Sequence, residues 1–176
     1  MPSCARSFTR VGGPTLTLGL MFATHTAQAL EPIPSATDTL FTLGPSLAYA
    51  PGDGQRSGFL AGADATITAG FGWGSLGARV RPGETWNAYP YVEVGVWFVV
   101  NFGVGYSLGL GPDASPQNWH WFVGLPIPLG SLGSSDHPLL FIEPYYRPTM
   151  SIDDPSPTLH ELGLLVKWAW PVGSKK

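Results

Sequence analysis

Charge, cysteine and long apolar segments are all scarce in this chain. Only 12% of its 176 residues are charged and the formal net charge is −3, so its electrostatics do not favour nucleic acid as a partner. A single cysteine, Cys4, rules out a framework of disulfides. After Ala29, no apolar run reaches the roughly 18 residues of a membrane-spanning helix. These absences argue against both helical membrane proteins and disulfide-stabilised scaffolds.

Spacings that typify metal and catalytic sites are also missing. His120, His137 and His160 are not joined by H-x-x-x-H or H-E-x-x-H spacing, so we predict no metal site and no cofactor. His160 and Glu161 are adjacent, but neighbouring residues of a strand point to opposite faces and cannot act together as a catalytic pair. We therefore predict no catalytic residues and no enzymatic activity.

The N-terminal region has the features of a secretory signal peptide. Arg6 and Arg10 precede an apolar stretch at residues 16–22, and Ala27-Gln28-Ala29 supplies a cleavage site of small residues. Cleavage after Ala29 would also remove Cys4. The predicted organisation is a signal peptide for Sec-type export at 1–29, a periplasmic leader at 30–38, one domain at 39–170 and a C-terminal tail at 171–176.

Within that domain, apolar and polar side chains alternate with a period of two. Between Leu159 and Trp170 the even positions are mostly apolar, whereas the odd positions include Glu161 and Lys167. Successive side chains of a strand point to opposite faces, so one face would be lipid-like and the other charged. The pattern predicts eight strands, at about residues 39–50, 58–70, 75–81, 89–99, 103–110, 119–129, 140–151 and 159–170.

An even number of such strands favours an all-β fold, an antiparallel up-and-down transmembrane β-barrel. With the apolar face toward lipid, four acidic and four basic residues enter the lumen. They are Asp64, Arg79, Arg81, Glu93, Glu143, Arg147, Glu161 and Lys167. Eight strands enclose a lumen just wide enough for side chains to fill, and unpaired buried charges are costly. We therefore expect a network of ion pairs that crosses and plugs the lumen.

Prolines mark a possible weakness in the wall. Pro144 and Pro148 lie on one predicted strand with the same parity, and Pro126 and Pro128 lie on the preceding one. Alternate residues hydrogen-bond to opposite neighbours, so each pair omits donors toward a single adjacent strand. This predicts weakened hydrogen bonding on one side of the strand at residues 140–151. The strand at residues 119–129 is the candidate for the neighbour on that side.

Aromatic residues gather near the predicted strand ends, as expected at the two interfaces of a bilayer. The predicted interface residues are Tyr49, Trp73, Trp119, Trp121, Trp168 and Trp170.

In these features, residues 39–170 resemble the small eight-stranded outer-membrane barrels of Gram-negative bacteria, such as the transmembrane domain of OmpA. The alternating residues Leu162, Leu164, Val166, Trp168 and Trp170 look like the C-terminal signal that the barrel-assembly machinery recognises in that class. Chains of that class usually end at the final aromatic residue, whereas residues 171–176 follow here. The resemblance implies an outer-membrane location, with outer-membrane lipid and the assembly machinery as partners. It leaves the oligomeric state open.

Three functions are compatible with the sequence. The first is a barrel with a plugged lumen and a structural, adhesive or envelope-integrity role. The second is a lipid-active enzyme or a lateral conduit for lipid. The third is a soluble periplasmic carrier of an apolar ligand, similar to lipocalins, which would bury the apolar parity and expose the charged one.

Overall fold

The computed structural model describes residues 39–51, 58–131, 138–152 and 159–172, which form strands and turns and no helix. The predicted signal peptide, the leader, His137 and residues 173–176 of the predicted tail lie outside the described residues. The strands are β1 (Thr39–Ala50), β2 (Gly58–Ala69), β3 (Gly72–Arg81), β4 (Asn87–Trp97), β5 (Asn101–Leu108), β6 (Gln117–Gly124), β7 (Ile127–Ser131), β8 (Leu139–Ser151) and β9 (Leu159–Val172).

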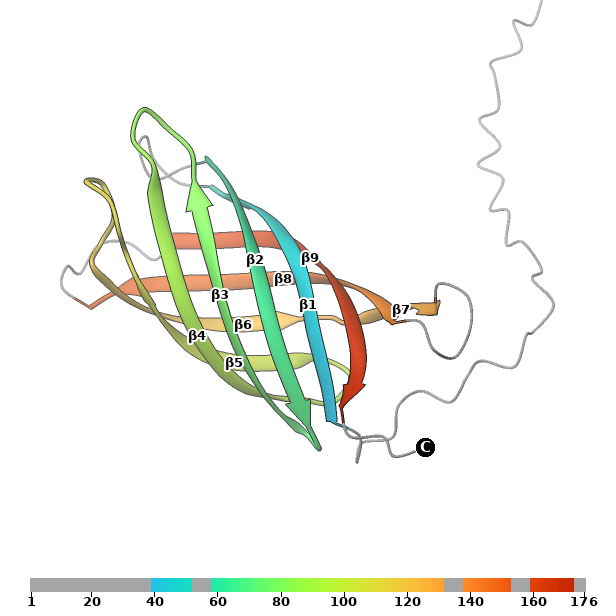
Figure 1. Cartoon of the computed structure of the whole chain (residues 1–176). Coiled ribbons are helices and arrows are strands. Elements are labelled where there is room, and N and C mark those ends of the chain that lie inside the picture. The colour runs from blue at the N-terminus through green and yellow to red at the C-terminus, as the bar shows by residue number, and fades with distance from the viewer. Residues whose placement is uncertain (1–38, 52–57, 132–137, 153–158, 173–176) are drawn as a thin grey trace, which may run out of the picture. The chain divides into compact units, whose positions relative to one another are not determined.

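These strands form a closed antiparallel barrel (Figure 1). β1 pairs with both β2 and β9, and β6 pairs with both β5 and β8, so the sheet has no open side along its main length. β6 and β7 are two parts of one predicted strand, because both pair with β8. Counted together, they give the eight-stranded up-and-down barrel that the sequence predicts, and this prediction is confirmed.

The strands are strongly tilted around the barrel. A circuit of paired residues that leaves β1 at Tyr49 passes through β9, β8, β6, β5, β4 and β3 and reaches β2 at Ala69. Ala69 lies beside the opposite end of β1, where Leu40 pairs with Thr68. Closure of a small barrel requires such a displacement, because the strands must tilt for the sheet to meet itself.

The apolar parity faces outward and the charged parity faces the lumen. Val94 and Leu164 are 62% and 42% exposed, whereas Glu93 and Lys167 are 3% and 8% exposed. A soluble carrier of an apolar ligand would need the reverse arrangement. The structure is therefore inconsistent with the third function considered above.

Some element boundaries differ from the predicted ones. β4 ends at Trp97 and β5 begins at Asn101, so the turn occupies residues 98–100 instead of 100–102. β3 begins at Gly72, after a turn in which Gly70 has a φ of 60°, a conformation that glycine adopts without strain. β9 continues to Val172, two residues beyond the predicted end of the domain.

The ladder between β8 and the β6–β7 pair is interrupted, whereas that between β8 and β9 is continuous. The amide of Leu125 donates to the carbonyl of Pro144 at 3.0 Å, so Pro144 faces β6 and β7, and so does Pro148 four residues later. Neither proline nitrogen can donate. The interruption predicted from these prolines is therefore present. A second one, which we did not predict, lies at Pro45 between β1 and β9.

Candidate functional site

The lumen contains two charged clusters, of which the first is centred on Arg147. Its Nε lies 2.8 Å from Oε1 of Glu93, and its Nη1 lies 3.0 Å from Oε1 of Glu161. Arg79 pairs with the other carboxylate oxygen of Glu161. The four side chains come from β8, β4, β9 and β3, so the cluster joins separate parts of the wall across the lumen. Two cations and two anions leave it formally neutral.

Aromatic rings enclose the Arg147 guanidinium. Its Cζ lies 4.8 Å from the ring centroids of both Tyr91 and Tyr145, and 5.2 Å from that of Phe122. The Tyr145 hydroxyl also donates to Glu161 at 2.6 Å. Cation–π contacts and hydrogen bonds thus hold a charged group that is almost fully removed from water.

Two further lumen residues join the first cluster or lie near it. Nε2 of His120 lies 2.8 Å from Oε1 of Glu93, a contact that the sequence analysis missed. His120 belongs to the polar parity of the predicted strand at 119–129, but a single histidine on that face carries no signal of its partner. Arg81, one of the eight predicted lumen residues, is buried and donates to the Tyr89 hydroxyl at 2.8 Å.

The second cluster is centred on Lys167. Its Nζ lies 3.1 Å from Oδ1 of Asp64, 3.0 Å from Oε2 of Glu143 and 3.3 Å from the hydroxyl of Thr66. Asp64 also accepts from the hydroxyls of Thr66, Ser75 and Tyr91. One ammonium therefore serves two carboxylates, and this cluster carries a formal excess of one negative charge.

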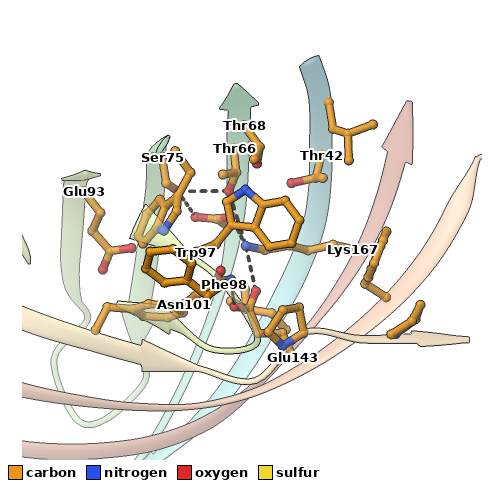
Figure 2. A pocket seen from close by; sticks show the side chains of 18 of the residues that line it. Thr42, Thr66, Thr68, Ser75, Glu93, Trp97, Phe98, Asn101, Glu143 and Lys167 are labelled. Carbon is orange, nitrogen blue, oxygen red and sulfur yellow. Dashed lines mark hydrogen bonds and ion pairs between the residues drawn. The ribbon is translucent and has the colours of Figure 1, made fainter. Parts of the chain in front are cut away.

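Beside the second cluster lies a cavity of about 270 Å³ (Figure 2). Figure 2 shows the Lys167 side chain extending across it, with Thr66 on one side and Glu143 on the other. Its polar lining includes Thr42, Asn101 and Glu93, and its apolar lining includes aromatic rings. Those rings belong to Trp73, Trp97, Phe98, Phe122 and Phe141.

Trp73 corrects one of the predicted interface positions. It is 8% exposed and points into the lumen, where its Nε1 donates to the carbonyl of Val96 at 3.2 Å. The prediction was wrong because β3 begins at Gly72, which gives Trp73 the inward parity of Ser75. Methyl groups on Gly95 and Gly103 would overlap its ring, so these glycines make room for it.

The other predicted interface aromatics lie on the outward parity. The rings of Tyr49 and Phe59 pack with their centroids 5.3 Å apart, and those of Trp119 and Trp121 lie 6.2 Å apart. Trp170 lies 6.1 Å from Phe41 of β1. The remaining residues of the predicted assembly signal, Leu162, Leu164, Val166 and Trp168, follow the same outward parity of β9.

His160 and Glu161 do not cooperate in the structure. Glu161 is buried in the lumen, whereas His160 is exposed on the outer wall. Nδ1 of His160 lies 2.5 Å from the hydroxyl of Tyr146, and the two rings stack 5.9 Å apart.

Among the described residues, no group of three or more histidine, cysteine, aspartate or glutamate side chains is arranged to hold a metal ion. In the same part of the chain, no helix is long and apolar enough to span a membrane.

Comparisons with known proteins add a structural likeness. No protein-family model and no curated protein match the chain. Among solved structures, the chain is similar to the crystal structure of Neisserial surface protein A, with 10% sequence identity and a TM-score of 0.47. The match covers 76% of this chain and 97% of that one.

Proposed function

We propose that this protein is an outer-membrane β-barrel whose lumen is closed by ion pairs and which has a structural, adhesive or envelope-integrity role. In this proposal the protein is exported, has outer-membrane lipid around its wall and uses β9 as the signal for the assembly machinery. It carries no catalytic activity.

The outward apolar parity is the observation that carries the proposal. A folded protein in water rarely leaves large apolar side chains exposed in a continuous band. Here they occur on strand after strand, for example at Leu76, Val92, Val104 and Leu162. A closed barrel satisfies its backbone hydrogen bonds internally, which lets such a band face hydrocarbon.

The closed lumen is supported by the Arg147 cluster. Arg147, Glu161 and His120 each have 1% or less of their surface exposed, which argues against a water-filled path beside them. The aromatic rings of Tyr91 and Phe122 fill the space around them. A narrow eight-stranded barrel leaves little room beyond this.

Fractionation and conductance together test the proposal. The full chain should remain in the membrane fraction after a urea wash and require detergent for extraction. Reconstituted into planar bilayers, it should give no steady unitary conductance, with vesicle flotation as the check that it inserted. Recovery in the soluble periplasmic fraction would contradict the membrane location, and steady conductance would contradict the closed lumen.

A second candidate function, a lateral conduit for lipid, is favoured by a notch in the wall beside β7. β5 pairs with β6 only as far as Asn101 and Gly124, whereas β7 continues along β8 to Ser131, and none of the described strands pairs with its other edge. Pro126 and Pro128 face that edge, because Leu125 faces β8. Proline has no N–H group. At these two positions the edge therefore carries no backbone donor that lipid would leave without a hydrogen bond.

The notch borders the cavity, since Pro126, Pro128, Phe98 and Val99 all line it. A spin-labelled lipid provides the test. It should contact a nitroxide-sensitive probe at Asn101 in the lumen if lipid enters laterally. Contact confined to probes on the outer wall, such as one at Val104, would contradict the conduit and leave the closed barrel in place.

A further inference from the structure

The ammonium group of Lys167, beside the cavity, has no free N–H bond for a ligand to use. An ammonium group has three N–H bonds, and Lys167 directs them at Asp64, Glu143 and Thr66 within 3.3 Å. An anionic ligand would have to displace one of these partners. The cavity therefore does not favour a carboxylate or phosphate, although it contains a lysine.

Acceptors, in contrast, are in excess. Glu143 receives Lys167 on Oε2 and the Asn101 amide on Oε1, which leaves lone pairs on both oxygens. The Thr42 hydroxyl, which can both accept and donate, is buried and has no hydrogen-bond partner among the described residues, although Thr42 lines the cavity. A buried polar atom without a partner is uncommon and suggests a missing group.

Aromatic faces complete the environment. Trp73, Trp97, Phe98 and Phe122 line the same cavity. Aromatic faces attract cations and also pack well against an apolar body. The Lys167 cluster also has a formal excess of one negative charge. A ligand that complements this lining has a positive head and an apolar body.

From these observations we infer that the cavity is a binding site for an amphipathic organic cation. The cationic head contacts Glu143 and Thr42, and the apolar body packs against Trp73, Trp97 and Phe98. A primary ammonium head suits this arrangement because it has three N–H bonds to donate to a carboxylate and a hydroxyl. The Arg147 cluster closes the far side of the cavity, so the site is a pocket and not a passage.

Three small probes with the same ring and different heads test the inference. Phenethylammonium, phenethyl alcohol and phenylpropionate should be titrated into the full chain in non-ionic detergent, with empty micelles as the blank. We expect saturable binding of the ammonium that is at least about tenfold tighter than that of the other two, a difference that one charge-assisted contact can supply. Equal or tighter binding of the anion, or no binding of the ammonium above the blank, would overturn the inference.

Two variants locate the site. Glu143→Gln keeps the side-chain shape and should weaken binding of phenethylammonium about tenfold, whereas Thr42→Val should weaken it a few-fold. Glu84→Gln removes an exposed carboxylate in the turn between β3 and β4 and should leave it unchanged. Unchanged affinity in both pocket variants would overturn the inference.

Heat-dependent migration on a gel would verify that each variant is folded, and Thr42→Val keeps the test valid if Glu143→Gln does not fold. The result is independent of the proposed function, because a closed membrane barrel without ligand affinity would still pass fractionation and conductance.

Discussion

Arg147 of β8 and Glu93 of β4 form an ion pair across the lumen, with Nε 2.8 Å from Oε1. The same guanidinium binds Glu161, so one side chain links two buried carboxylates. Alternation along the strand places these residues inside, but only closure of the barrel brings β4 and β8 face to face. The stability of the barrel should therefore depend on Arg147 more than on any exposed charge.

Arg147→Met should lower the free energy of unfolding by about 3 to 5 kcal/mol, because it leaves buried Glu93 without an arginine and leaves Glu161 with Arg79 alone. Urea unfolding in lipid vesicles would measure the change. Glu84→Gln, at an exposed position, should change the same quantity by less than about 0.5 kcal/mol. Adding Glu93→Gln to Arg147→Met should recover part of the loss. A loss no larger than that of Glu84→Gln would show that the network does not stabilise the fold.

Gly44→Ala should destabilise the barrel by about 1 to 3 kcal/mol, because a methyl group there would overlap the backbone of Val166 and Lys167 on β9. Gly74→Ala is the matched control, since the nearest atom to a methyl group there is the Glu93 carbonyl oxygen at 3.9 Å. Both changes replace a glycine in a strand with alanine, so the difference in β-propensity between the two residue types affects both variants about equally. Equal unfolding midpoints for the two variants would contradict the close approach of β1 and β9.

The fold was largely predictable because a period of two is a local property. Each strand reveals its two faces without reference to the others, and Glu93 and Leu164 lie on the predicted sides. The ends of the strands were harder to predict from the sequence. Trp73 was misplaced because a Gly-rich segment permits a turn at several positions, and a strand that begins at Gly72 places the tryptophan on the same inward parity as Ser75.

Partners inside the lumen could not be predicted from the sequence. Glu143 and Arg147 are four residues apart on β8, yet Glu143 pairs with Lys167 and Arg147 with Glu161. Those pairings depend on the register between β8 and β9, in which Arg147 lies opposite Glu161. The cavity depends on how side chains from many strands fill the lumen together. The alternation along each strand gives the face of a residue but not this packing.

Pro148→Val should strengthen the interrupted ladder. The new N–H would face β6, where the register places the carbonyl of Trp121, and a hydrogen bond there contributes about 0.5 to 1.5 kcal/mol. Amide exchange of Val123 should slow. Pro126→Val, just before β7, is the control, because its new N–H would point away from β8, toward the side on which none of the described strands pairs with β7. Slower exchange with Pro126→Val to the same extent would contradict the assigned direction of the missing donors.

Val92→Lys distinguishes a lipid-facing wall from one that faces water. Val92 lies midway along β4 and is 55% exposed, whereas Val172, at the end of β9, is 48% exposed. In a bilayer, a lysine near the midplane costs about 2 to 4 kcal/mol, and one at the interface costs about 0 to 1 kcal/mol. Unfolding from vesicles should therefore show a much larger loss for Val92→Lys than for Val172→Lys. In water, both positions are already solvated and both lysines should be nearly neutral. Equal, small effects would mean that the apolar parity does not face hydrocarbon.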